Sequence, residues 1–394
     1  MYDTFTSDHL TTILISCLII YLALVKYLRF QHRDQLLKNF SHLNSASKLK
    51  DMTYEESREI SRVLIELNCP YISHTSLSLA LFQTYSVPSI SKLSNKTGRL
   101  NLPSCVGKRA EDTVCLLAEL QTFGLFSQRG SLAISRINFL HSIYSTSISP
   151  DDLLFTLSLF IFEPLRLIDQ FEWRTSTELE KYSRFVLWSH IGQKMGIKHL
   201  PSTPEDLLNW LKVYKTKAVV FDPSNVKLGE ATINLFARPY PKFLKPFLRK
   251  SIIYFLPDDI REAFGWSNEI PLYISRLIPI IFKIRSFLLL HFTLPRQASF
   301  DFGLRDPSLE NASMDDETTF YQRSNWLFEP WYVKKTFWNQ FWSVFGFSVP
   351  SNEFQQEGYE IHQLGPREFA KLGHSWVHGQ AKDIRESDPE KHTS

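Results

Sequence analysis

The side chains best placed for chemistry lie in the string RINFLHSIY, residues 136–144. At about 100° per residue, Asn138, His141 and Tyr144 share one face of a helix, whereas Arg136 points elsewhere. A histidine on such a face can ligate a metal or transfer a proton. It is more often a buried structural residue, so the pattern alone leaves both interpretations open.

Arg166 is a second candidate because of its surroundings. It lies in the apolar stretch LLFTLSLFIFEPLRLI, where an unpaired guanidinium would be costly. It should therefore face a carboxylate or an acidic group of a cofactor. Glu163, Asp169 and Glu172 are equally good partners from the chain itself.

Several other kinds of site are excluded. The sequence contains no GxGxxG, GxxxxGK[ST], GxSxG or HExxH motif and no kinase signature. His374 and His378 have a helical metal-ligand spacing but no third ligand in sequence. The four cysteines show no CxxC spacing, and a formal net charge of +3 gives no electrostatic footprint for nucleic acid. We therefore expect no nucleotide, zinc or nucleic-acid site.

The elements that position these residues are predicted to be helices. The 394 residues include only 14 Gly, against 31 Phe, 15 Tyr and 9 Trp. Strand-rich and dinucleotide-binding folds use glycine for turns and phosphate contacts, so this composition favours helices around a large apolar interior. No run of alternating apolar residues indicates a sheet. We predict an all-α fold.

Helix starts are marked by capping residues. Four candidate N-caps precede helical stretches: Thr53, Ser149, Thr177 and Thr203. The stretch after Ser149 is apolar on nearly every side, which predicts a buried central helix.

Three further segments carry weaker signals. Ile270–Phe292 is apolar but interrupted by Arg276, Lys283 and Arg285, and Pro279 should kink it, so a second membrane span is disfavoured. Of the other two possibilities, a core helix is favoured over one on the membrane surface. Residues 299–323 are polar and predict an exposed loop. A disordered tail is expected over residues 382–394.

Residues 10–28 predict a transmembrane anchor. Leu10–Val25 is uncharged, and with its flanks the apolar stretch reaches about 21 residues, enough to cross ~30 Å of hydrocarbon. No positive n-region or cleavage site marks a signal peptide. Acidic residues precede the stretch and Lys26 and Arg29 follow it, which places residues 1–9 in the lumen and the body in the cytosol. The short span suits the endoplasmic reticulum.

Strings in a fixed order along most of the chain resemble the fungal MpaB family of membrane-bound oxygenases. These strings are LFxTYxxPxIS and KTG (81–98), RxxFLHS (136–142), DLLxTLxLF and PLRxIxxFEWRT (152–175), TFWN (336–339), and GY followed by GP (358–366). The MpaB family is related to the bacterial latex-clearing (rubber) oxygenases. The N-terminal anchor agrees with the resemblance.

The resemblance implies a helical oxygenase domain over residues 50–370, on the cytosolic face of the endoplasmic reticulum. Such enzymes use O₂ to oxidise or cleave a carbon–carbon double bond in an isoprenoid chain, typically in fungal secondary metabolism, including that of meroterpenoids. Their rubber-cleaving relatives hold b-type haem through a histidine within a helix. An aromatic-rich helical chain is suited to an apolar tunnel for such a substrate.

The resemblance also ranks the site residues. The iron-binding histidine of the bacterial relatives corresponds to Leu157, which cannot ligate iron. Either another residue ligates the iron in this branch, or haem is bound differently, or the metal is a different one. His141 is the histidine inside the most recognisable string of the resemblance, so it is the first candidate for an iron ligand or distal group. Arg166 and Arg136 are candidates to hold a haem propionate, and Arg136 can also polarise bound oxygen. Glu119 is a candidate base for attack of O₂ on an alkene, although a solvated glutamate is its commoner state.

A competing hypothesis is a non-catalytic, membrane-anchored protein that binds a lipid or prenylated intermediate and hands it to partner enzymes. It predicts the same anchor and apolar cavity. The enzyme hypothesis additionally predicts that His141, Arg136 and Arg166 converge on one cavity large enough for a porphyrin. Three scattered side chains would favour the binding protein.

Overall fold

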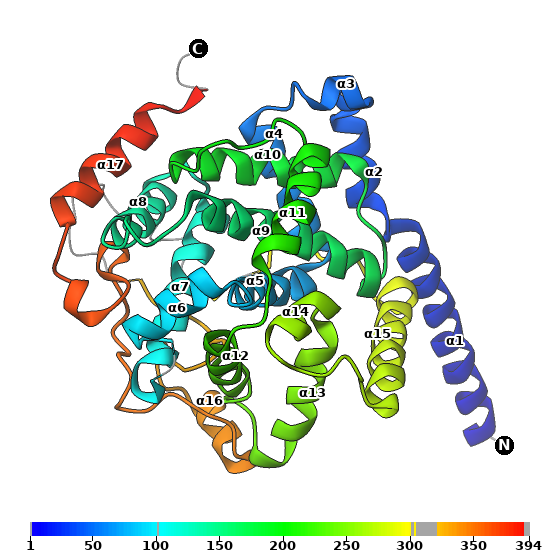
Figure 1. Cartoon of the computed structure of the whole chain (residues 1–394). Coiled ribbons are helices and arrows are strands. Elements are labelled where there is room, and N and C mark those ends of the chain that lie inside the picture. The colour runs from blue at the N-terminus through cyan, green and yellow to red at the C-terminus, as the bar shows by residue number, and fades with distance from the viewer. Residues whose placement is uncertain (1, 101, 301–302, 305–320, 390–394) are drawn as a thin grey trace. The chain divides into compact units, whose positions relative to one another are not determined.

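The computed structural model describes residues 2–100, 102–300, 303–304 and 321–389. Over these residues the chain is helical, and the β structure described consists of three isolated bridges without a strand. The predicted all-α fold is therefore confirmed. Figure 1 shows the helices along the chain. Most of the predicted polar loop, residues 299–323, lies outside the described residues.

The helices are, in chain order, α1 (Tyr2–Leu28), α2 (Gln31–Asn39), α3 (Ala46–Leu49), α4 (Tyr54–Arg62), α5 (Pro70–Thr84), α6 (Pro88–Thr97), α7 (Pro103–Phe123), α8 (Gln128–Ser142), α9 (Pro150–Phe171), α10 (Glu178–Lys194), α11 (Pro204–Ala218), α12 (Pro223–Phe236), α13 (Lys245–Phe255), α14 (Asp258–Ala263), α15 (Leu272–Phe292), α16 (Phe337–Phe341) and α17 (His374–Glu386).

The chain divides into two compact units, and the division runs through the range 50–370 that the sequence predicted as one domain. Unit 1 comprises Met1–Leu77, Phe162–Leu187 and Ser275–Phe300, and unit 2 comprises Ser78–Ile161, Trp188–Ile274 and Asp301–Ser394. Helices α5, α9, α10 and α15 therefore contribute residues to both units.

Helices begin where the capping residues predict. The Thr53 hydroxyl accepts from the backbone N–H of Glu56, whose carboxylate accepts from the Thr53 N–H at 2.8 Å. Thr177 and Glu180 make the same exchange at the start of α10. Thr203 caps α11 with its hydroxyl, which accepts from the backbone N–H of Asp206 and donates to the Asp206 carboxylate. These local interactions satisfy N–H groups that have no partner inside the helix.

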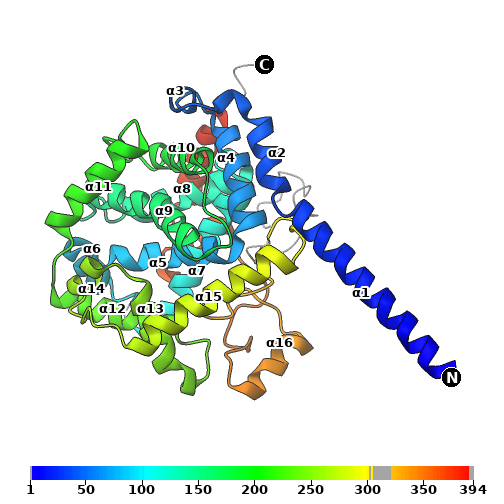
Figure 2. The same ribbon diagram turned by 90° about the vertical axis from the view of Figure 1, so that its right-hand side faces the viewer.

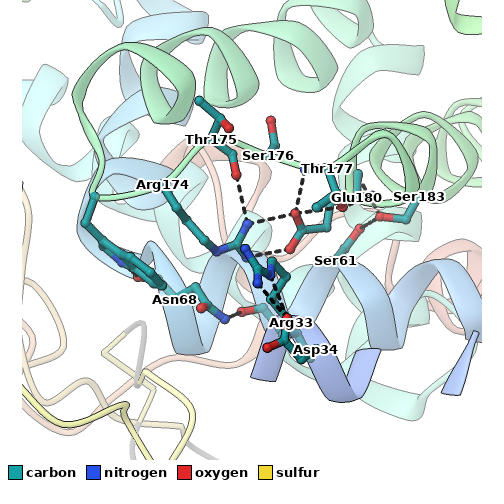
Figure 3. A network of polar contacts seen from close by, with 12 residues as sticks. Arg33, Asp34, Ser61, Asn68, Arg174, Thr175, Ser176, Thr177, Glu180 and Ser183 are labelled. Atoms are coloured by element: carbon teal, nitrogen blue, oxygen red, sulfur yellow. Dashed lines mark hydrogen bonds and ion pairs between the residues drawn. The ribbon is translucent and has the colours of Figure 1, made fainter. Parts of the chain in front are cut away.

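A buried ion pair fixes the turn between α9 and α10 in unit 1 (Figure 3). Arg174 donates to both carboxylate oxygens of Glu180, at 2.9 and 2.6 Å, and also to the Thr175 carbonyl. The side chains of the pair are only 4% and 0% exposed. The N–H of Thr177 donates to the same carboxylate, so Glu180 serves both the helix cap and the ion pair.

The C-terminal helix α17 continues further than the sequence predicted. It runs to Glu386, into the range 382–394 expected to be disordered. Val377, Ala381 and Ile384 are buried, and α17 packs against α8. Burial of this apolar stripe stabilises the helix, whereas residues 390–394 lie outside the described part.

Helix α1 contains the predicted anchor. Within the described chain, His9–Asn39 contains a helical stretch of 18 residues that is apolar enough to cross a bilayer, and only 6% of that stretch is buried inside the protein. Ile19 and Ile20 are 61% and 67% exposed. Such exposure of large apolar side chains is typical of a segment surrounded by lipid.

Helix α15 differs from its predicted place in the core. Ile274 and Ile278 are buried, but most of its large apolar side chains are exposed. The sequence pattern does not distinguish the two cases, because a helix apolar on most sides can face either a core or a membrane.

Glu180→Gln should lower the stability of the protein by about 3–5 kcal/mol, because it leaves the buried Arg174 cation without a counter-charge. Glu178→Gln is the matched control: Glu178 is 81% exposed and pairs with Lys181 on the surface, so its loss should cost no more than about 0.5 kcal/mol. Thermal denaturation of both variants in the same detergent measures the difference. Equal shifts of the midpoint would contradict the role assigned to the pair.

Candidate active site

An apolar cavity of about 270 Å³ lies within unit 2. Its walls are mainly Leu, Ile and aromatic side chains from α5 to α10. Four ionisable side chains interrupt these walls: Tyr85, Arg109, His141 and Asp152. The volume is close to the lower end of the ~300–1,000 Å³ range of small-molecule sites.

His141 lies in the last turn of α8 and faces this cavity. No described residue forms a hydrogen bond with its ring. Burial, and secondarily the positive charge of Arg109, lower the pKa of His141 to about 4. The imidazole is therefore neutral at pH 7 and offers a nitrogen lone pair to a metal ion.

Arg109 faces the same cavity from α7. It donates to the hydroxyl of Thr113 one turn further along, and it forms no ion pair with a described carboxylate. Two other arginines of unit 2, Arg129 and Arg323, are instead paired with buried carboxylates. A guanidinium in apolar walls without a counter-charge is suited to bind an acidic ligand group.

Asp152 and Tyr85 complete the ionisable groups of the cavity. The Asp152 carboxylate accepts from the Tyr214 hydroxyl at 2.5 Å and from Ser89 at 2.8 Å, so its oxygens have partners. The Tyr85 hydroxyl has no partner among the described residues. Burial raises the pKa of Tyr85, which keeps its proton in place at neutral pH.

Helix α7 presents two separate stripes of side chains. One stripe faces the cavity: Arg109, Thr113, Leu116, Leu117 and Leu120. The other carries charged groups that contact the C-terminal part of unit 2: Lys108, Glu111, Asp112 and Glu119. The same helix therefore lines the cavity with one side and contacts the C-terminal segment with another.

The buried carboxylates on the charged stripe of α7 have hydrogen-bond partners within the protein. Glu111 accepts from three successive backbone N–H groups, those of residues 327 to 329, and pairs with Arg323. Asp112 accepts from the Tyr332 hydroxyl at 2.6 Å and from the Gly365 N–H at 3.1 Å. Both carboxylates are completely buried. Their interactions hold α7 to the segment after residue 320.

Arg136 has a partner for each guanidinium nitrogen, and all three are backbone carbonyls. It donates to Leu364 at 2.8 Å, to Phe369 at 2.8 Å and to Leu372 at 2.9 Å. It is 0% exposed and is not among the described residues that line the cavity. The structure thus places Arg136 at the junction of α8 with the C-terminal segment, away from the position expected for a residue that holds a propionate or oxygen.

Glu119 is neither solvated nor part of the cavity wall. Its carboxylate accepts from Arg129 at 2.6 and 2.7 Å and from the Tyr359 hydroxyl at 2.5 Å. A base that activates a substrate must lie within hydrogen-bond reach of it. These contacts instead make Glu119 a buried link between α7, α8 and the C-terminal segment.

Arg166 belongs to unit 1, whereas every residue lining the cavity belongs to unit 2. It donates to the carboxylate of Glu163 at 2.9 Å, one of the partners proposed from the sequence, and to Gln170 at 3.3 Å. The expected convergence of His141, Arg136 and Arg166 on one cavity is therefore not observed. Of the three, His141 alone reaches the cavity.

Asn138 and Tyr144, predicted on the same helix face as His141, do not line the cavity with it. Asn138 donates to the Lys194 carbonyl at 2.9 Å, and Tyr144 accepts from Arg99 at 2.8 Å. Ile137 and Leu140 line the cavity instead. The cavity-facing side of α8 is thus rotated by about one residue from the face predicted.

Leu157, on α9, lines the same cavity as His141. It packs against Gly192, where an added Cβ would lie 2.7 Å from a Leu157 methyl group. Two positions that could carry a ligand, one from each of two helices, therefore face one space.

His374 and His378 have a neighbour that is distant in sequence. The His362 ring centroid lies 4.2 Å from that of His374 and 5.1 Å from that of His378. In the part of the chain that the structure describes, no group of three His, Cys, Asp or Glu side chains is arranged to hold a metal ion.

The lowered pKa of His141 predicts a pH dependence of stability. Because the pKa is about 4 in the folded protein and ~6.5 in an unfolded chain, the unfolded chain binds the proton first as the pH falls. Stability should therefore decrease from about pH 6.5 towards pH 4, and His141→Leu should remove part of this decrease. Thermal midpoints at pH 7 and pH 5 measure it.

His199→Asn is the control for this experiment. His199 is exposed, and asparagine tolerates its positive φ of 58°. This variant should keep the full pH dependence of the wild type. A His141→Leu variant with the wild-type dependence would contradict the environment described for His141.

Comparison with known proteins finds relatives along most of this chain. The catalytic domain described as ER-bound oxygenase mpaB/B′/Rubber oxygenase matches residues 132–279, which include His141 and Leu157. The chain is 31% identical to ER-bound oxygenase mpaB′ of Penicillium brevicompactum, over 95% of this chain and 92% of that protein. It is 30% identical to ER-bound oxygenase mpaB of the same fungus, over 88% and 85% of the two chains.

A third relative, ER-bound oxygenase mpaB of Penicillium roqueforti, is 32% identical over 63% of this chain and 88% of its own. The relatives are oxygenases by name, which favours an enzyme over a non-catalytic carrier. The chain is therefore an oxidoreductase that belongs to the family of mpaB-type ER-bound oxygenases and rubber oxygenases.

Proposed function

We propose that this enzyme holds b-type haem in the cavity at His141 and uses O₂ to oxidise or cleave a carbon–carbon double bond of an isoprenoid or prenylated substrate. The observation that carries the proposal is a neutral imidazole, His141, that has no hydrogen-bond partner among the described residues and faces an apolar cavity, together with the guanidinium of Arg109, which has no described carboxylate partner. We place the reaction in fungal secondary metabolism, by analogy with the fungal relatives.

The donor set of the cavity fits haem. A porphyrin supplies four nitrogen ligands, so one histidine is enough to hold its iron, and His141 is the histidine in the cavity wall. Bound haem iron would supply the redox chemistry that activates O₂. The neutral state of His141 at pH 7 means that no proton has to be displaced before it ligates iron.

Arg109 would bind the acidic edge of the cofactor. Haem propionates are carboxylates, and Arg109 is the cavity cation without a described carboxylate partner. A charge-assisted, bidentate hydrogen bond is the strongest interaction that a guanidinium makes with such a group. Thr113, which accepts from Arg109, would keep the guanidinium oriented.

The apolar walls would bind the substrate and exclude water. Leucine and isoleucine side chains dominate the cavity, and they suit an isoprenoid chain better than a polar metabolite. The Tyr85 hydroxyl keeps its proton and can donate a hydrogen bond to an oxygen atom in the cavity. Because about 270 Å³ is less than the volume of a porphyrin alone, the proposal requires the lining side chains to move outward when haem binds.

We further propose that α1 anchors the enzyme in the endoplasmic reticulum membrane as a single span, with the catalytic body in the cytosol. The apolar stretch of α1 and the names of the relatives support this location. The basic residues after the span support the orientation. An apolar substrate partitions into the same membrane, so the anchor would keep enzyme and substrate together.

His141→Ala should weaken haem binding by at least ~10–100-fold, the loss that even outer-shell changes produce at metal sites, and should abolish turnover. Leu157→His in the His141→Ala background should recover part of the binding, because both positions face the cavity. Titration of detergent-solubilised protein with haem, followed by absorbance, measures both. Arg166→Ala is the matched control and should bind as the wild type does; unchanged binding by His141→Ala would remove His141 from the site.

Arg109→Met should weaken haem binding by roughly 10–100-fold, equivalent to one lost charge-assisted hydrogen bond. The effect should vanish when haem dimethyl ester, which lacks the propionate charges, replaces haem in the titration. Arg166→Met should discriminate between haem and its ester as the wild type does. If Arg109→Met still discriminates like the wild type, Arg109 does not bind the propionates.

A further inference from the structure

Helix α15 carries its apolar stripe on the outside of unit 1. The exposed side chains recur at helical spacing: Leu277, Ile280, Ile281, Ile284, Phe287 and Leu288. Ile284 and Phe287 are 56% and 55% exposed. A surface helix of a soluble protein normally has the opposite arrangement, with its apolar stripe against the core and polar residues outside.

The other face of α15 contacts the C-terminal end of α9 through hydrogen bonds and a pair of aromatic rings. Arg285 donates to both carboxylate oxygens of Glu172, each at 3.0 Å. Ser286 donates to the carbonyl of Phe171, and the rings of Phe171 and Phe282 lie 4.9 Å apart. The orientation of the helix is therefore set by specific contacts within unit 1, and these contacts direct the apolar stripe outward.

The C-terminal end of α15 lies beside the predicted membrane anchor. The Tyr21 hydroxyl of α1 donates to the carbonyl of Phe292 at 3.0 Å, and both residues belong to unit 1. Figures 1 and 2 show that α15 meets α1 at this end, and Figure 2 shows it running across the direction of α1. Tyr21 lies seven residues before the end of α1 at Leu28 (28 − 21 = 7), or about 10 Å along the helix.

We propose that α15 is a second membrane-contacting helix, which lies in the cytosolic leaflet of the bilayer that α1 crosses. This inference rests on the anchoring role proposed for α1. If α1 is the span, its contact with Phe292 puts the end of α15 below the membrane surface, at the 5–10 Å depth typical of interfacial helices. The exposed stripe then faces acyl chains, and its burial in lipid removes its contact with water.

The charges of α15 agree with a membrane surface. Arg276 and Lys283 are exposed, and the helix contains no acidic residue. Long basic side chains on an interfacial helix reach the headgroups and are attracted to anionic lipids of the cytosolic leaflet. A binding face for a soluble protein partner would not require the contact with the anchor helix.

Spin labelling of the full-length protein in lipid nanodiscs tests the proposal. Cys17, on α1, and Cys105 are the exposed native thiols. In a Cys105→Ser background, the label on Cys17 reports on the anchor. In a Cys17→Ser and Cys105→Ser background, Ile284→Cys reports on α15, and Val213→Cys, 55% exposed on α11, is the matched water-facing control.

The expected result is an oxygen-to-nickel-chelate accessibility ratio at Ile284→Cys that is close to the ratio at Cys17 and severalfold above that at Val213→Cys. A lipid-like ratio at Cys17 with a water-like ratio at Ile284→Cys would overturn the proposal for α15 while leaving the anchor intact. Water-like ratios at both sites would overturn both. Low accessibility to both reagents at Ile284→Cys, as in a protein interface, would also overturn it, in favour of a second copy or another protein.

Discussion

The buried charges of α7 and α8 are the constraint on which the architecture of unit 2 depends. Glu111, Asp112, Glu119 and Arg136 are all almost completely removed from water, and each would be strongly destabilising without partners. The segment after residue 320 supplies those partners as backbone N–H groups, carbonyls, tyrosine hydroxyls and one arginine. Before α17 this segment contains only α16 and three short 3₁₀ helices among its described residues, so these hydrogen bonds largely determine the path of its backbone.

The same constraint distinguishes Arg109 and His141 from the other buried polar residues of unit 2. The charged groups on the outer stripe of α7 have partners within the protein. Arg109 faces the apolar cavity and donates to Thr113, but it has no described counter-charge. His141 faces the same cavity, and no described residue forms a hydrogen bond with its ring. Polar groups left unsatisfied at the wall of a cavity are costly unless a ligand completes them. The contrast between the two stripes therefore supports the proposal that Arg109 and His141 bind a ligand, and it does so more strongly than either residue alone.

Local signals in the sequence predicted the helices well, because capping interactions such as those of Thr53 and Thr177 join residues only three apart. His141 was found because it lies in a recognisable string. Arg136 and Glu119 were assigned to the reaction because their partners lie more than 200 residues away, at Leu364 and Tyr359, and periodicity carries no information about such pairing. The position of Arg109 in the cavity wall could not be predicted for the same reason, because a surface arginine and a cavity arginine without a carboxylate partner look alike in sequence. The exposure of the apolar side of α15 could not be predicted either. An apolar helix is assigned to the core on the assumption that its side chains would otherwise face water, and this assumption leaves out the membrane.

The central claim is that the cavity is a haem site organised around His141. The most direct measurement is the absorption spectrum of the full-length protein purified in mild detergent from haem-supplied cells, together with its iron content. The account predicts a Soret band and about one iron per chain, as for single-haem proteins. Protein that contains neither, and that shows no Soret band after haem is added, would contradict it.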